Sequence, residues 1–110
     1  MSGQPHERRV ENYRLIAVQD AVALGYFRIT PRVLKHLSLV GWDTATIQEC
    51  VASLRPEDFY KSQRHHSRAD AWLDIYKPVY NGERIYLKFT LHENGTEYLV
   101  LSFCRDGARH

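Results

Sequence analysis

The sequence predicts an α+β fold in which N-terminal helices pack on a mostly antiparallel C-terminal β-sheet. Before residue 56, apolar residues recur at helical spacing between residues that favour helix ends. After residue 56, strand-forming residues alternate with polar ones, and two Asn-Gly pairs separate the expected strands. Because 110 residues is a usual length for one domain, we expect a single domain over residues 1–110.

The first expected helix runs from Val10 to Leu24 and ends at a cap on Gly25. Its apolar residues recur at the helical period and predict a buried face made of Val10, Tyr13, Ala17, Ala21 and Leu24, which Ile16 and Val18 broaden. The next segment, YFRI at 26–29, is too short for a helix and rich in strand formers. It predicts a short strand between two helices.

Two further helices complete the first half. Thr30 and Pro31 suit an N-cap followed by the first helical position, and Gly41 suits the end of that helix. Asp43 can cap the third helix, whose apolar stripe includes Cys50, and which ends before Pro56. We expect Cys50 to belong to the core.

The second half predicts antiparallel strands joined by tight turns. The pairs Asn81-Gly82 and Asn94-Gly95 suit hairpin turns because both turn residues must accept positive φ. Pro78 predicts an edge or a bend in the strand that contains it. The expected strands cover residues 58–63, 72–80, 84–92 and 96–105.

Alternation assigns two faces to the strand at 84–92. One face is apolar and predicts core, with Ile85, Leu87, Phe89 and Leu91. The other collects polar and chemically useful groups, namely Arg84, Tyr86, Lys88, Thr90 and His92. This second face is either a solvated surface or part of a site. In the strand at 58–63, Tyr60 and Lys61 should point to opposite faces.

The overall composition excludes several classes of protein. A net charge of +2 and a pI near 8.6 give no general case for nucleic acid, so any such case must be local. The longest apolar runs are too short for a membrane span, and the N-terminus lacks the apolar core of a signal peptide. Two isolated cysteines and histidines without ligand spacing predict no disulfide and no metal. We therefore expect a cytoplasmic protein with no membrane association and no cofactor.

Four motifs resemble the MqsR family of bacterial toxins, which are mRNA interferases with a RelE-like fold. These motifs are DFYKS at 58–62, WLDIY at 72–76, IYLKFT at 85–90 and LVLSF at 99–103, and the resemblance extends from Pro5-His6 to Phe103. The resemblance implies that Lys61 and Tyr86 are catalytic. At two positions the chain departs from the family pattern, with Leu73 where the family has Gln and Cys104 where it has Lys.

Several residues are candidates to complete such a site. Arg105, next to Cys104, could supply the missing catalytic cation, with Arg64 or Lys88 as alternatives; we expect Arg64, Arg68 and Lys88 to bind RNA. An imidazole titrates near neutrality, so His65, His66 and His92 are possible acid or base groups. Because adjacent residues of an extended segment point in opposite directions, at most one of His65 and His66 should face the phosphate.

The chemistry that the resemblance implies needs no metal. RNA carries its own nucleophile, the 2′-hydroxyl, so the enzyme need only move protons and stabilise the charged pentavalent phosphate. The resemblance further implies ribosome-independent cleavage of single-stranded mRNA at a GC-containing site. It also implies a separate antitoxin protein that binds zinc and has a helix-turn-helix domain. Operator DNA would be bound only through this antitoxin. The alternative is a catalytically impaired RNA-binding or antitoxin-binding regulator of the same fold.

Overall fold

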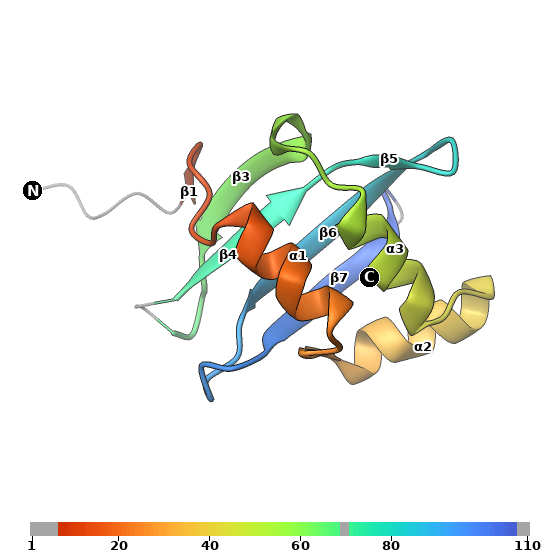
Figure 1. Ribbon diagram of the computed structural model, residues 1–110, viewed down its shortest axis with the longest axis horizontal. Coiled ribbons are helices and arrows are strands. Elements are labelled where there is room, and N and C mark those ends of the chain that lie inside the picture. Colours follow the sequence, from red (N-terminus) through yellow and green to blue (C-terminus); the bar gives the residue numbers. More distant parts are fainter. Residues whose placement is uncertain (1–6, 69–70, 108–110) are drawn as a thin grey trace, which may run out of the picture.

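Three helices lie against one face of a mostly antiparallel sheet in the computed structural model (Figure 1). The structure describes residues 7–68 and 71–107, so Pro5 and His6, where the resemblance begins, lie outside the described residues. The predicted α+β class is confirmed. The helices are α1 (Leu15–Ala23), α2 (Pro31–Val40) and α3 (Thr44–Ala52), followed by a 3₁₀ turn, η1 (Pro56–Asp58). The strands are β1 (Glu7–Arg8), β2 (Phe27–Ile29), β3 (Phe59–Arg64), β4 (Trp72–Tyr76), β5 (Val79–Tyr80), β6 (Glu83–Leu91) and β7 (Tyr98–Arg105).

The first helix begins later than predicted and buries only part of the predicted face. The carboxylate of Asp74, which is fully buried in β4, accepts hydrogen bonds from the backbone N–H groups of Asn12 and Tyr13, with N···O distances of 2.9 Å. These bonds hold the segment before α1 against the sheet, so the helix starts at Leu15. The buried residues of α1 are Val18 and Val22, whereas Val10, Ala17 and Leu24 of the predicted stripe are exposed. The prediction for this helix was therefore wrong in its start and right only in part about its buried face, since Val18 and Tyr13 of the predicted stripe do contact the core.

The second helix matches both of its predicted ends and the third matches its predicted start, although α3 already ends at Ala52. Thr30 accepts a hydrogen bond from the backbone of Val33, and Gly41 takes a left-handed conformation with φ of 76°. Asp43 and Thr46 form a reciprocal capping box at the start of α3. Local capping chemistry is sufficient to define these ends because each bond joins residues a few positions apart.

The sheet has the strand order β1-β3-β4-β6-β7-β2, with β5 paired to β6. All pairings are antiparallel except β2 with β7. Asn81 and Gly82 both have positive φ and form the predicted hairpin turn. Pro78 divides the strand predicted at 72–80 into β4 and β5. The Asn94-Gly95 turn belongs to a longer loop, so β7 begins at Tyr98 rather than at residue 96.

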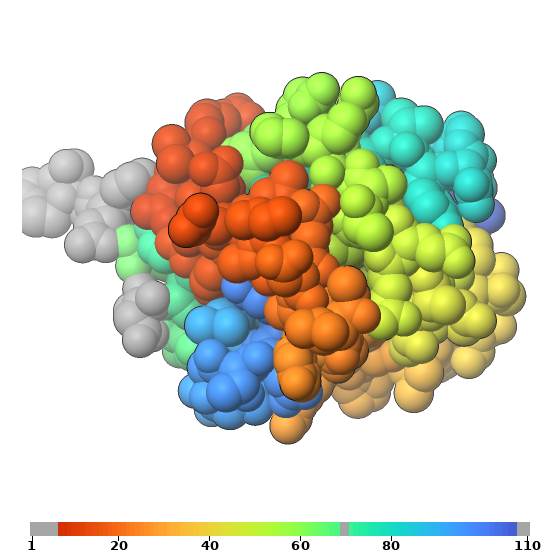
Figure 2. Space-filling view, in the orientation of Figure 1, coloured from red at the N-terminus to blue at the C-terminus, as the bar shows by residue number. Residues whose placement is uncertain are grey.

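The main core lies between the helices and what we call the inner face of the sheet. Figure 2 shows this side of the molecule covered by residues of α1 and α3. From β6, Ile85, Leu87 and Phe89 enter the core, as alternation predicted, and Cys50 enters it from α3 with no exposed surface. Burial, and the nearby Asp58 carboxylate, raise the pKa of the Cys50 thiol to about 12. Within the described residues, no helix has the length and apolar character to cross a membrane.

Candidate functional site

The opposite, outer face of the sheet carries a row of paired residues that begins at Lys61. Lys61 on β3 pairs with Ile75 on β4, Ile75 pairs with Lys88 on β6, and Lys88 pairs with Ser102 on β7. Directly paired residues of neighbouring antiparallel strands share one face of the sheet. The sheet register therefore brings Lys61 and Lys88 to the same face, with one residue between them.

A second row adds two tyrosines and a third lysine. Tyr86 lies on the same face, two residues from Lys88 along β6. Lys77 follows β4 directly, and its Nζ lies 6.0 Å from the centre of the Tyr86 ring and 3.9 Å from that of Tyr60. The Nζ of Lys61 lies 5.3 Å from the same Tyr60 ring. We call Tyr60, Lys61, Lys77, Tyr86 and Lys88 the lysine–tyrosine face.

Tyr60 joins this set because β3 contains an irregularity. Phe59 pairs with Tyr76 while Lys61 pairs with Ile75, so the register shifts between them and Tyr60 becomes an extra residue. Such a bulge interrupts the alternation of side chains. The prediction that Tyr60 and Lys61 point to opposite faces was wrong for this reason. The Lys61 Nζ lies beside the Tyr60 ring, and the Lys77 Nζ lies near both the Tyr60 and the Tyr86 rings.

Two lysines of this face are held by carboxylates from the ends of the chain. Lys61 Nζ lies 2.5 Å from a carboxylate oxygen of Glu7 on β1, and Lys77 Nζ lies 3.5 Å from one of Asp106 after β7. The Lys61 and Lys77 side chains retain only 18% and 25% of their exposure. Each cation is thus partly desolvated and already bound to an oxyanion, and a phosphate oxygen could take the place of that carboxylate.

The two positions that depart from the family pattern are both buried. Leu73 is 4% exposed and Cys104 is not exposed at all. Cys104 pairs with Tyr86 and packs with it and Ile75 in a small cluster on the outer face. Cys104 thus packs against the Tyr86 ring and brings no charge to it.

Lys77 is the functional candidate that we did not predict from the sequence. Trp72, Asp74 and Tyr76 alternate along β4, so parity assigns Ile75 and Lys77 to the face opposite Tyr76. Tyr76 lies in the main core on the inner face. Parity alone could therefore have placed Lys77 on the same face as Lys61 and Tyr86.

The structure does not bring Arg105 or Arg64 to the lysine–tyrosine face. Arg105 pairs with Ile85, whose side chain lies in the main core, and its guanidinium lies 4.9 Å from the Trp42 ring centre and forms an ion pair with Glu83. Regular pairing continues to the end of β7, so Arg105 keeps the inner-face orientation. Arg64 pairs with Trp72 and lies 4.9 Å from that ring, in register with Asp74 on the inner side.

The remaining predicted residues gather at one end of the sheet. An open pocket of about 370 Å³ is lined by residues of the turn after β3 and the loop after β6. We call it the histidine pocket; its lining is His65, Ser67, Arg68, His92, Glu93 and Leu99. It unites His65, Arg68 and His92, which the sequence analysis selected separately.

Both histidines of the pocket accept hydrogen bonds from the backbone. The Nδ1 of His65 accepts from the N–H groups of Ser67 and Arg68 at 3.1 and 3.2 Å, and the Nδ1 of His92 accepts from that of Asn94 at 3.1 Å. In the neutral tautomer that this geometry requires, Nε2 carries the hydrogen and is a donor. Burial lowers the pKa of His65, and so do the nearby His66, Arg68 and Lys88.

His66 does not point away from His65, contrary to our prediction. The two rings stack with centroids 5.2 Å apart and an angle of 10° between their planes. β3 ends at Arg64, so the alternation of an extended strand no longer applies to these residues. Within residues 7–68 and 71–107, no group of three or more His, Cys, Asp or Glu side chains is arranged to hold a metal ion.

Comparisons with known proteins point to one family. A family model described as "Motility quorum-sensing regulator, toxin of MqsA" matches residues 11–105. The mRNA interferase toxin MqsR of Escherichia coli (strain K12) is 31% identical over 97 residues, which cover 88% of this chain and 96% of that protein. The matched range includes the whole lysine–tyrosine face and the whole histidine pocket.

Proposed function

Because the chain belongs to the MqsR toxin family, we propose that it is an mRNA interferase that cuts single-stranded mRNA without a metal ion and without the ribosome. The observation that carries the proposal is the lysine–tyrosine face. The two residues that the family resemblance marks, Lys61 and Tyr86, share that face with Lys77 and Lys88. Lys61 and Lys77 lie beside the exposed Tyr60 ring, which suits a strand that presents both phosphates and unstacked bases, while Tyr86 is only 5% exposed.

The lysines supply electrostatic stabilisation in the proposed reaction. The RNA 2′-hydroxyl attacks the adjacent phosphorus, the bond to the 5′-oxygen breaks, and negative charge grows on the phosphate oxygens in between. Lys61 and Lys77 are partly buried, so their charges act on that phosphate with less screening than in open solvent. Binding requires a phosphate oxygen to replace the carboxylate of Glu7 or Asp106.

Tyr86 is the proton-transfer group in this proposal. Its hydroxyl can donate a proton to the leaving 5′-oxygen while the attacking 2′-hydroxyl loses its own proton to solvent water, and Tyr86 takes a proton back from solvent after cleavage. His65 and His92 line the pocket at the end of the sheet and use Nδ1 to bind the backbone. His92 follows Tyr86 by six residues, about 20 Å along an extended strand, which is too far for shared proton transfer at one bond.

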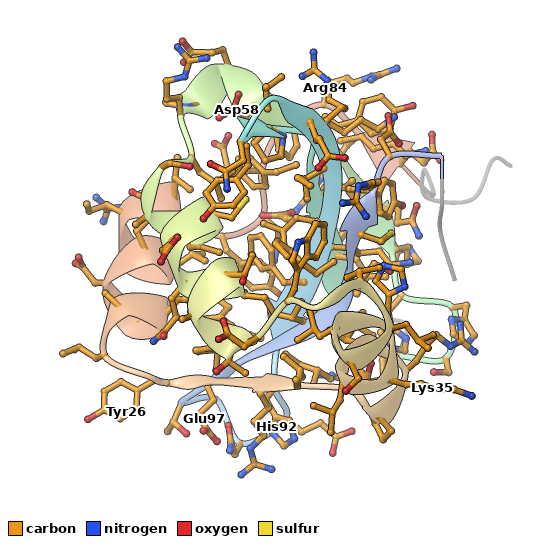
Figure 3. The ribbon with its side chains drawn as sticks, turned by 90° about the vertical axis from the view of Figure 1, so that its right-hand side faces the viewer. Tyr26, Lys35, Asp58, Arg84, His92 and Glu97 are labelled. Atoms are coloured by element: carbon orange, nitrogen blue, oxygen red, sulfur yellow. The ribbon has the colours of Figure 1, made fainter. Side chains whose placement is uncertain are left out.

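The test is RNA cleavage by the purified protein in EDTA. We expect specific cleavage by the wild type and loss of it in both Lys61→Ala and Tyr86→Phe. Matched controls are Lys35→Ala and Tyr26→Phe, since Lys35 on α2 and Tyr26 before β2 are exposed and outside this face (Figure 3). Activity that disappears with EDTA, or that survives in both site variants, would exclude the proposed mechanism.

A second candidate function rests on the buried Leu73 and Cys104. The family resemblance places a Gln and a Lys at these positions, and here neither side chain offers a polar group to RNA. The alternative is a catalytically impaired protein of this family that binds RNA or the antitoxin without cutting. Stable binding of an RNA that the wild type leaves intact would favour it, whereas cleavage dependent on Lys77 would favour the enzyme.

The family also suggests partners for this chain. The family description names a toxin of MqsA, so we propose a cognate antitoxin that binds this protein in the cytoplasm. In this proposal the antitoxin carries the zinc site and the helix-turn-helix, and the toxin–antitoxin complex binds operator DNA through the antitoxin. Coexpression with the adjacent gene product should give a purifiable complex and should suppress cleavage. Mapping of the cleaved ends would test the proposed GC-containing site.

A further inference from the structure

The histidine pocket has the chemistry of an anion site separate from the lysine–tyrosine face. Its three nitrogen-bearing side chains come from two loops that are distant in sequence, residues 65–68 after β3 and residues 92–97 after β6. In each imidazole, Nδ1 accepts a hydrogen bond from a backbone N–H two residues further along the chain, which leaves Nε2–H as the donor of the ring. Arg68 adds a planar guanidinium with several donors. Glu93 is the one carboxylate in the lining.

The electrostatic surroundings of His65 agree with this description. Burial lowers its pKa, and His66, Arg68 and Lys88 lower it further because positive charges disfavour the imidazolium. Lys88 belongs to the lysine–tyrosine face, so one cation lies within electrostatic reach of both regions.

We propose that the histidine pocket binds a backbone phosphate of the RNA substrate, several nucleotides away from the bond that is cut. The inference rests on the proposed function and gives it a second contact point. His92 stands about 20 Å from Tyr86 along β6, so the phosphate in the pocket and the phosphate under attack are different groups. The pocket would fix the position of the strand on the sheet without taking part in bond cleavage.

The first experiment measures binding of two RNAs in which every 2′-hydroxyl is methylated, so that neither can be cut. One is a dinucleotide, which occupies the lysine–tyrosine face alone, and the other is long enough to reach the pocket. Arg68→Ala should weaken binding of the longer RNA about tenfold, as expected for the loss of a charge-assisted contact. It should also lower the salt slope of binding by about 0.7, the value for one phosphate on a single strand. Binding of the dinucleotide should not change.

Two further variants separate charge from folding. Arg68→Lys retains a cation and should restore the salt slope. Arg55→Ala is the matched control, since Arg55 is exposed and pairs with Glu57 and Asp58. Figure 3 shows Asp58 at the end of the molecule opposite to His92. Equal binding of the longer RNA by the wild type and Arg68→Ala would overturn the inference.

The second experiment uses inorganic phosphate at constant ionic strength. The imidazole NMR signals of His65 and His92 should shift on addition of phosphate, and the pKa of His65 should rise because a bound anion favours the imidazolium. Arg68→Ala should reduce both effects. Wild-type protein whose histidine signals ignore phosphate would overturn the assignment of an anion site. If the wild-type protein binds neither RNA, the proposed function is refuted, and so is the proposal that the pocket binds a phosphate of RNA.

Discussion

Replacing Lys77 by glutamine removes one charge from the lysine–tyrosine face and should slow RNA cleavage about tenfold. The Nζ lies 6.0 Å from the Tyr86 ring centre, which is where we place the reacting groups. Two unit charges at that distance interact by about 3 kcal/mol at an effective dielectric constant of about 20. The side chain keeps 25% exposure and its charge is shared with Asp106, so we expect about half of that value. About 1.4 kcal/mol corresponds to tenfold in rate.

The assay is single-turnover cleavage with protein in excess over RNA, which isolates the chemical step from product release. Lys35→Gln on α2 is the control for loss of a surface lysine. Lys77→Gln also loses a contact with the Tyr60 ring and an ion pair, so unfolding should become easier by about 1 kcal/mol. A folded Lys77→Gln protein that cleaves RNA at the wild-type rate would refute a role for this lysine.

Three other changes test neighbouring parts of the account. Glu7→Gln removes the carboxylate that competes with RNA for Lys61. A binding titration should show RNA bound about two- to fivefold more tightly, the effect expected for loss of a surface ion pair. Weaker binding would show that Glu7 assists the substrate. Arg105→Ala should leave the cleavage rate unchanged because Arg105 faces Trp42, and a slower rate in a folded protein would return it to the site. In the wild type the hydrogen bond from Arg105 lowers the pKa of Glu83, and in Arg105→Ala NMR should show this pKa returning towards 4.5. The stabilisation that the wild-type pair gives is present above pH 4.5 and is lost as the pH falls through the lowered pKa. Asp74→Asn should cost about 2 kcal/mol in chemical unfolding because an amide offers one acceptor to the N–H groups of Asn12 and Tyr13, and an unchanged midpoint would show that these bonds do not hold the segment.

Local features of the sequence predicted much of this fold. The caps at Thr30 and Asp43 and the turn at Asn81-Gly82 follow from bonds between residues that are close in sequence. The faces of β6 followed from simple alternation. The start of α1 could not be predicted in this way, because it depends on Asp74, about sixty residues further along the chain.

The candidate site was predictable only in part. Family resemblance selected Lys61 and Tyr86, and alternation gave Lys88 the same face as Tyr86. A bulge moved Tyr60 to that face, and a bulge cannot be read from the residue types around it. Arg105 was proposed because the final residue of a strand is not held strictly to alternation; β7 does end at Arg105, but this residue stays paired with Ile85 and keeps the inner-face orientation.

The most direct test of the proposed function is cleavage of an RNA with a single 2′-deoxy nucleotide at the mapped cleavage site. In the proposed reaction the RNA supplies the nucleophile, and Lys61, Lys77 and Lys88 stabilise the charge. We therefore expect the substituted RNA to bind normally and stay intact, and the unsubstituted RNA to yield a 2′,3′-cyclic phosphate and a 5′-hydroxyl in EDTA. Cleavage of the deoxy-substituted RNA at the same bond, or products with a 5′-phosphate, would contradict the proposed reaction.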